Sequence, residues 1–347
     1  MGINSIIIAE VKELLKLSKI IDAFQLVEDN ISKHSKVYDE LIQIIQRYNS
    51  IVDQNQKGLI SKNDFDIKQN QIVRYFIFYV NSLKKSSDNE NLESLIYSAS
   101  KNLKLNFELS YYKNHSRVVR ENGSRNIWDF MVLLMAEIQD LIEKDKYRQE
   151  EVIQANIVNP DFMKILERAI EISSRSRSTM QKRLLAKVIK DRMTSFSDTF
   201  ESILQARCIE AVKSMTNDQL LILKYLSKIS FIEHSKDNEE LAKKNIIEYI
   251  SYLLVFFEDI PSRIDWDDIL YLEELNLVRE DEALVICELR TALFPRSVHE
   301  KHKREIRQFF ESKIGGKLES NWYYIKKYLL SSTGKYLGNV LLKIDEY

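Results

Sequence analysis

Glycine and proline are scarce in this sequence, with 7 and 3 residues among 347. Average usage would give roughly 24 and 17. β-Sandwiches, barrels and dinucleotide-binding units use glycine freely at turns and phosphate loops, so the shortage argues against them and favours long helices. Neither a G-x-x-x-x-G-K-[S/T] nor a G-x-G-x-x-G motif occurs. The common nucleotide-binding loops are therefore excluded.

An excess of charge is also lacking. Lys and Arg total 51 and Asp and Glu 52, which gives a formal net charge of −1. No overall field therefore draws the protein toward nucleic acid or an anionic membrane. The two cysteines, Cys208 and Cys287, are far apart in sequence and lie in apolar helical patterns. We expect buried thiols rather than a disulfide, as in a reducing compartment.

Long apolar runs are missing as well. At the N-terminus, Ile6–Ile8 is soon followed by Glu10 and Lys12, so the apolar core of a signal peptide is lacking. An apolar run such as Tyr252–Phe257 is far short of the roughly 18 residues that a membrane span needs. The sequence predicts a soluble, cytoplasmic protein that does not act at a membrane.

Apolar residues recur at intervals of three and four almost without interruption from residue 6 to residue 83. This is the spacing of buried helix faces. Gly58 is expected to end one of these helices as a left-handed C-terminal glycine, followed by Leu59 as an apolar lock. Ser61 is expected to cap the next helix. The segment therefore predicts a domain built of consecutive helices.

Changes in composition and in the apolar pattern divide the rest of the chain. Residues 84–91 are polar and unpatterned, and the pattern changes again after Pro261, so the predicted domains are 1–85, 86–260 and 261–347. Residues 115–126, with the only glycine of the middle region, are interpreted as an exposed loop. Helices are predicted over 160–174, 179–193, 198–214, 217–232 and 238–258. A capping box is expected at Thr216–Gln219.

The C-terminal domain combines short helices with strand-like segments. A helix from Trp266 is followed by Val278, then a helix over 296–313 that ends before Gly315-Gly316, and an apolar stretch leads into a closing helix. Small winged-helix modules often have this order, and a helical tail is the alternative. The predicted fold class is mainly α, with a small helical N-terminal domain, a larger helical domain, and this C-terminal region.

Catalytic motifs are missing from the chain. No H-E-x-x-H motif occurs, and His299 and His302 are surrounded by basic residues that would repel a metal ion. No G-x-S-x-G elbow is found. The carboxylates around Asp267 are more typical of a solvated acidic face. We therefore predict no catalytic residue, no metal and no cofactor, and a protein that is not an enzyme.

Charge is arranged in blocks of alternating sign. Residues 164–192 carry a net +6, 256–288 a net −9, and 296–335 a net +6. Such blocks suit docking between domains or subunits, and separate solvated faces are the alternative. The candidate interaction residues in the two basic blocks are Arg175, Arg177, Lys326 and Lys327.

The second basic block also carries aromatic residues. Trp322, Tyr323 and Tyr324 directly precede Ile325 and Lys326. Lysines neutralise phosphates, and aromatic rings stack on bases. Direct binding of nucleic acid is therefore an alternative for this region.

Three stretches near the N-terminus carry a family resemblance. They are Ala23–Leu26, Gln46–Asn49 and Lys57–Phe65, the last with its Gly58-Leu59-Ile60-Ser61 core. Residues 5–83 thereby resemble an effector-associated domain of bacterial conflict systems, a small helical adaptor often fused to proteases, caspase-like enzymes and pore formers. Asn63-Asp64 replaces the usual pair of glutamates. The resemblance implies self-association or pairing with a like domain.

A second resemblance covers much of residues 160–347. It rests on Ile172–Arg175, Leu184–Ile189, Thr216–Leu220 and Leu330–Gly338. These segments are similar to an uncharacterised, defence-linked family of bacterial helical proteins. The resemblance brings no catalytic residues with it.

Together these observations predict a non-enzymatic adaptor, scaffold or sensor of a bacterial antiphage or conflict system. Its partner would be a second copy of itself or a protein with a like domain. Leu59, Ile60 and Phe65 are the candidate contact residues, with the core of the hairpin as the alternative role. A nucleic-acid-binding regulator that uses the basic C-terminal region is the second hypothesis. An enzyme of unfamiliar type, built on the acidic stretch, is the third.

Overall fold

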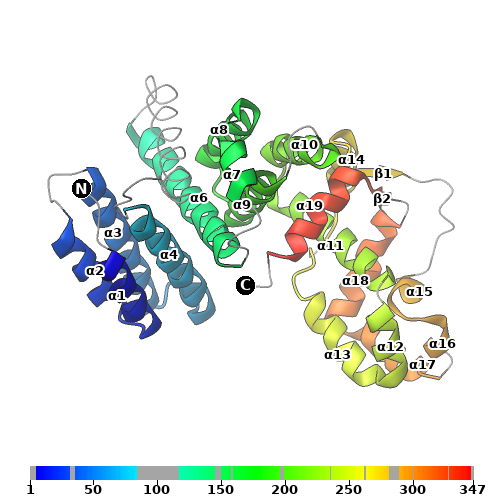
Figure 1. The fold of residues 1–347 in the computed structure, drawn as a ribbon. Coiled ribbons are helices and arrows are strands. Elements are labelled where there is room, and N and C mark those ends of the chain that lie inside the picture. Colours follow the sequence, from blue (N-terminus) through cyan, green and yellow to red (C-terminus); the bar gives the residue numbers. More distant parts are fainter. Residues whose placement is uncertain are drawn as a thin grey trace. The chain divides into compact units, whose positions relative to one another are not determined.

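The computed structural model is mainly α-helical, as predicted, with one small sheet in the described part (Figure 1). The described residues are 5–31, 36–83, 117–144, 150–157, 159–195, 199–234, 236–261, 263–280, 289–299, 301–326 and 328–344. Residue contacts divide the chain into unit 1, Met1–Ser202, and unit 2, Ile203–Tyr347. The predicted linker at 84–91 lies outside the described residues, and the three predicted domain limits stay predictions.

Unit 1 consists of helices in the described ranges. Their bounds are α1 (Ser5–Lys16), α2 (Ile20–Asn30), α3 (Lys36–Gln56), α4 (Lys62–Ser82), α6 (Arg117–Lys144), α7 (Glu150–Ile157), α8 (Pro160–Arg175) and α9 (Thr179–Thr194). Helices α1–α4 pack in sequence order and α1 also contacts α4, while α6 lies against α4, α8 and α9. Helix α6 therefore links the N-terminal bundle to the helices that follow it.

The predicted helix ending at Gly58 and the predicted cap at Ser61 are confirmed, but Leu59 is 70% exposed and is not the apolar lock that was expected. Gly58 has a φ of 67°, its N–H donates to Asn55 O, and the N–H of Leu59 donates to Gln54 O. This pair of bonds is the Schellman ending of a helix, which needs the left-handed conformation that glycine adopts freely. Ser61 then accepts a bond from the N–H of Asp64 and caps α4.

Ring contacts and a hydrogen bond show how α2, α3 and α4 run relative to one another. The Phe24 ring lies 5.4 Å from that of Tyr48 and 4.7 Å from that of Phe76, and Tyr75 Oη donates to Glu40 Oε1 at 2.5 Å. Glu40 near the start of α3 thus meets the later part of α4, so these helices are antiparallel. In such an up-and-down bundle, alternate turns lie at one end. The α1–α2 and α3–α4 turns therefore share an end.

The loop predicted over residues 115–126 is wrong from Arg117 onward, because α6 begins there. Glycine, serine and asparagine in this stretch have low helix propensity. Tertiary contacts override it: Asn126 Nδ2 donates to Ser174 O at 3.1 Å, Asn126 Oδ1 accepts from Lys182 at 3.0 Å, and Ile127 is fully buried. Asn126 thus anchors the end of this stretch to α8 and α9.

Unit 2 begins within α10 and contains short helices and a two-stranded sheet. Its elements are α10 (Phe200–Ser214), α11 (Asn217–His234), α12 (Lys236–Lys244), α13 (Ile246–Phe256), α14 (Trp266–Glu274), β1 (Val278–Glu280), α15 (Leu289–Leu293), α16 (Arg296–His299), α17 (Lys303–Glu311), α18 (Lys313–Ile325), β2 (Tyr328–Leu330) and α19 (Ser332–Leu342). Strands β1 and β2 are antiparallel, with Val278 opposite Leu330. Helix α11 contacts α14, α15, α19 and β2, so it forms the centre of this unit.

Local signals in unit 2 were predicted with mixed success. The capping box is confirmed, since Thr216 N–H donates to Gln219 Oε1 and Gln219 N–H donates to Thr216 Oγ1. The single helix predicted over 238–258 is wrong. Asn245 separates α12 from α13 and caps α13 by accepting from the N–H of Glu248. An internal N-cap thus ends one helix and begins the next.

The glycines near the C-terminus permit close packing. Gly315 and Gly316, expected after a helix end, lie instead in the first turn of α18, and a Cβ at Gly315 would lie 2.0 Å from Phe309 O. A Cβ at Gly334 would lie 1.9 Å from Leu277 O, and one at Gly338 would lie 1.7 Å from Ser227 Oγ. Helix α19 therefore packs directly on α11 and on the residue before β1. The winged-helix assignment stays a prediction.

Two lysines are buried in unit 2. The side chains of Lys224 and Lys228 on α11 are 3% and 7% exposed, and both are paired with Asp259. Burial raises the pKa of Asp259, but hydrogen bonds from the two lysines outweigh burial and hold the pKa below its ordinary value. Across the described ranges, no helix is both long and apolar enough to cross a bilayer.

The two adjacent glycines of α18 provide a matched test of close packing. Gly315→Ala places a Cβ against backbone and is expected to destabilise the protein by about 1–3 kcal/mol, as overpacking does. Gly316→Ala meets only Phe310 O at 3.7 Å, so it is expected to be neutral or to stabilise the protein by up to about 1 kcal/mol. Urea unfolding followed by circular dichroism measures both. Equal stability of the two variants would contradict the packing.

Candidate functional site

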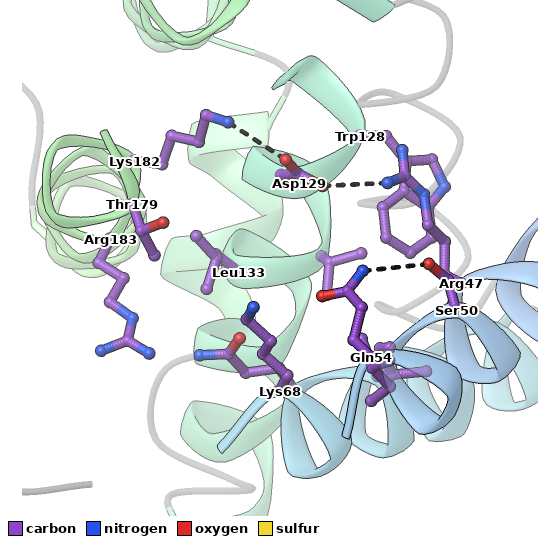
Figure 2. Close-up of a pocket in the computed structure, with 14 residues that line it drawn as sticks. Arg47, Ser50, Gln54, Lys68, Trp128, Asp129, Leu133, Thr179, Lys182 and Arg183 are labelled. Carbon is purple, nitrogen blue, oxygen red and sulfur yellow. Dashed lines mark hydrogen bonds and ion pairs between the residues drawn. The ribbon is translucent and has the colours of Figure 1, made fainter. Parts of the chain in front are cut away.

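The candidate site is a cavity of about 260 Å³ within unit 1, enclosed by α3, α4, α6 and α9. Figure 2 shows side chains from all four helices directed toward it. The lining residues are Arg47, Ser50, Ile51, Gln54, Lys68, Gln71, Ile72, Trp128, Asp129, Val132, Leu133, Thr179, Lys182 and Arg183. Helices α3 and α4 belong to the N-terminal bundle, so the cavity lies where that bundle meets the rest of unit 1.

Positive charge dominates the lining. Four of its side chains are basic, Arg47, Lys68, Lys182 and Arg183, whereas Asp129 is the only acidic one. The formal charge of the lining is therefore +3. Low-dielectric walls strengthen the field of charges in such a concave site. The cavity therefore suits an anionic ligand.

Asp129 is the centre of the charge arrangement. Its carboxylate lies 3.2 Å from Lys182 Nζ and 3.7 Å from a guanidinium nitrogen of Arg47. The Lys182 side chain is 5% exposed and that of Asp129 is 40% exposed. Burial lowers the pKa of Lys182, and the adjacent carboxylate opposes that shift. Asp129 is thus the counter-charge of a buried ammonium group in the lining of the cavity.

Arg47 also lies over an aromatic ring. Its guanidinium carbon is 4.7 Å from the centroid of Trp128, a cation–π arrangement. Burial is the main cause that lowers the pKa of Arg47, and the negative charge of Asp129 opposes this shift. The Trp128 ring also packs edge-on against Tyr75 of α4 at 5.8 Å. These contacts hold the α3–α4 hairpin against α6.

Two further cations come from opposite sides of the cavity. Figure 2 shows Lys68 extending from α4 and Arg183 from α9 into the space between these helices. Within the described ranges, no carboxylate lies at salt-bridge distance from Lys68. Thr179 is the first residue of α9, so the positive end of that helix dipole also lies at the cavity.

The sequence analysis missed this site as a whole. Arg47 was noted only within the family resemblance, and Lys182 only within a basic block. One signal was available: Lys182 precedes Leu185 and Ile189 by three and seven residues, which places a lysine on the buried stripe of α9. A cation on an apolar face indicates a buried counter-charge, but its identity required the fold.

The predicted contact residues Leu59, Ile60 and Phe65 lie outside the cavity. Leu59 is 70% exposed, and Ile60 and Phe65 are half-buried. Leu59 is therefore open to solvent at the α3–α4 turn, and both roles considered for Ile60 and Phe65, contact surface and hairpin core, stay predictions. Leu17 and Ile21, at the α1–α2 turn, are 66% and 68% exposed. Because the two turns share an end of the bundle, that end is apolar, and we refer to Leu17, Ile21, Leu59 and Ile60 as the apolar end.

The other predicted contact residues are distributed over both units. Arg175 is exposed and paired with Glu171 Oε1 at 2.8 Å, and Arg177 is exposed in the α8–α9 connection. In unit 2, Lys326 Nζ lies 5.1 Å from the centroid of Tyr323, whose side chain is 71% exposed. Lys327 lies outside the described residues. None of these residues lines the cavity.

The acidic stretch has structural roles in unit 2. Asp265 caps α14, and Asp268 accepts a bond from Gln219 Nε2 at 3.0 Å. His299 Nε2 lies 2.9 Å from Phe294 O. In the part of the chain that the structure describes, no three acidic, histidine or cysteine side chains converge as a metal site would require. Asp265 and Asp268 therefore take part in the capping and packing of α14.

The comparisons with known proteins agree with the fold of the N-terminal bundle. Residues 6–84 match the family model of effector-associated domain 11, so the bundle is an effector-associated domain, and the expected resemblance is confirmed. Such a domain indicates an effector-associated role in a conflict system.

A second family model matches residues 135–312, just over half of the chain, and the chain belongs to the family that it defines. The expected second family region is confirmed, although the match begins earlier than predicted and ends before Leu330–Gly338, one of the segments on which the resemblance rests. This match assigns no activity to the chain. No curated protein and no solved structure matches the chain.

Replacement of Asp129 tests its role as the counter-charge of the cavity. Asp129→Asn keeps the shape but leaves Lys182 and Arg47 without an anion. It is expected to destabilise the protein by about 2 kcal/mol, less than for a fully buried pair because Asp129 is partly solvated. Asp53→Asn breaks an exposed pair with Lys57 and is expected to cost at most about 0.5 kcal/mol. Urea unfolding compares the two, and equal losses would contradict the assigned role.

Proposed function

We propose that this protein is a non-enzymatic adaptor of a bacterial antiphage or conflict system that acts in the cytoplasm. Its effector-associated domain would associate with a second copy of itself and recruit a partner that carries a like domain. The remaining helices would act as the scaffold or sensor on which this domain is mounted. The observation that carries the proposal is the effector-associated domain at residues 6–84, supported by the exposed apolar end of its bundle.

The apolar end has the properties of an association surface. Leu17, Ile21 and Leu59 are each about two-thirds exposed, although burial of a leucine or isoleucine side chain stabilises a protein by about 1.5–3 kcal/mol. Exposed apolar residues gathered at one end of a domain are typical of protein interfaces. Ion pairs at the edge of this end, Lys16 with Glu13 and Lys57 with Asp53, provide the polar rim that interfaces usually have.

The mounting of the domain supports the scaffold role. Arg47 of α3 and Tyr75 of α4 both contact the Trp128 ring of α6. In addition, a guanidinium nitrogen of Arg74 on α4 lies 3.7 Å from Asp140 on α6. These contacts use the faces of α3 and α4 that meet α6, and the apolar end is formed by turns. Association through the turns would therefore leave the contacts with α6 intact.

The association surface is tested by light scattering behind size exclusion. Leu59→Glu in the full chain places a charge within the apolar end, and it is expected to lower the molar mass from an oligomer to a monomer. Burial of an unpaired carboxylate costs several kcal/mol, enough to dissociate a micromolar complex.

Ile247→Glu is the matched control, because Ile247 is 67% exposed on α13 of unit 2. It should leave the molar mass unchanged. If Ile247→Glu dissociates the oligomer and Leu59→Glu does not, the association surface belongs to unit 2. A wild-type monomer that also fails to bind a protein with a like domain would refute the proposal.

A nucleic-acid-binding regulator is the second candidate function. The observation that favours it is the exposed ring of Tyr323 with Lys326 Nζ beside it. An exposed aromatic ring can stack on a base while the neighbouring ammonium group meets a phosphate. The net charge of the whole chain, −1, gives this candidate no general electrostatic support, so we rank it second.

Gel shifts with single-stranded DNA and RNA test this candidate. If it is correct, binding at about 50 mM salt should weaken steeply by about 200 mM, as counterion release requires. Lys326→Glu should weaken binding by about tenfold or more, because it reverses the charge at a phosphate contact. Lys213→Glu, a charge reversal at an exposed position on α10, is the control. Equal weakening by the two variants would contradict a specific site at Tyr323 and Lys326.

A further inference from the structure

We propose that the cavity between α3, α4, α6 and α9 binds the phosphate groups of a small phosphorylated molecule. The residues that would contact the phosphates are Lys68, Arg183 and Lys182, with Arg47 and Asp129 holding the geometry. This site lies in unit 1 and is separate from the apolar end. The proposal therefore does not rest on association of the protein.

The charge of the lining selects a polyanion. Four cations and one carboxylate give the lining a formal charge of +3. A single carboxylate on a ligand would balance only one of these charges, whereas a diphosphate carries about three negative charges near pH 7. Lys68 contributes most directly, since it has no salt-bridge partner in the described part of the chain.

The donors surround the cavity and do not lie on one surface strip. Figure 2 shows Lys68 on one side, Arg183 on the opposite side and Lys182 beside Asp129. The first turn of α9, which begins at Thr179, adds the positive end of a helix dipole, where phosphates bind readily. Several cations around one cavity are typical of phosphate-binding sites.

The size of the cavity argues for a small molecule. About 260 Å³ lies just below the range of roughly 300–1,000 Å³ for typical small-molecule pockets. This volume suits a diphosphate group, with any larger part of the ligand directed to solvent. Walls from four helices are unlike the open groove along which a nucleic-acid backbone runs.

Isothermal titration of the full chain with inorganic pyrophosphate and with ADP tests the proposal. Saturable binding with one site per chain is expected for at least one of the two. Equal affinity for both would assign recognition to the phosphates alone. Binding of ADP alone would show that the nucleoside part also contributes, and both results support the proposal.

Variants assign the binding to the cavity. Lys68→Gln and Arg183→Gln should each weaken binding by roughly tenfold, the effect of losing one charge-assisted contact. Gln71→Glu adds a carboxylate to the lining and removes no existing charge, so it should weaken binding at least as much. Lys62→Gln is the control, because Lys62 is exposed on the same helix and does not line the cavity. Circular dichroism establishes that each variant is folded.

Three results would overturn the proposal. The first is that neither probe binds at millimolar concentration. The second is that binding is unchanged by both Lys68→Gln and Gln71→Glu, or is weakened equally by Lys62→Gln. The third is that a single-stranded RNA oligomer binds in a Lys68-dependent manner while pyrophosphate and ADP do not, which would assign the site to nucleic acid.

Discussion

A buried cation needs a counter-charge within reach, and both units of this protein are built around that constraint. In unit 1, α9 buries Lys182 and Lys187, and α6 supplies Asp129 and Glu137 at 3.2 and 3.6 Å. In unit 2, Asp259 serves two buried lysines of α11. Removal of the anion from such a group leaves a charge without solvation. The constraint therefore fixes the rotation of α6 about its axis, since its carboxylates must face α9.

This constraint also explains why the cavity remains polar. Lys182 and Arg47 share one carboxylate, so neither is fully neutralised, and apolar side chains cannot close over them without cost. Ile51, Ile72, Val132 and Leu133 line part of the wall, but the charged groups keep the space open. The same arrangement stabilises the contact between the effector-associated domain and α6 and leaves an anion-attracting surface within it.

Features set by neighbours in sequence could be predicted. The helix ending at Gly58 and the cap at Ser61 depend on residues within one turn, and both were predicted correctly. Features set by distant contacts could not. The loop expected before Ile127 is helical because Asn126 bonds to Ser174 and Lys182. The glycine pair at 315–316 lies in the first turn of a helix capped by Ser312, where Phe309 O leaves no room for a side chain at Gly315. The cavity itself joins four helices whose order in sequence gives no indication that they meet.

The family boundaries and the packing boundary do not coincide, and this has a consequence for how such chains recombine. The match to the effector-associated domain ends at residue 84 and that of the second family begins at 135. Trp128 and Asp129, on which the domain is seated, lie between these limits on α6. An exchange of domains at residue 84 would bring a foreign bundle against an indole and a carboxylate that were not selected for it. If the domain were inherited together with the first half of α6, its contacts with Trp128 and Asp129 would be preserved. We therefore expect these two segments to be exchanged together between proteins.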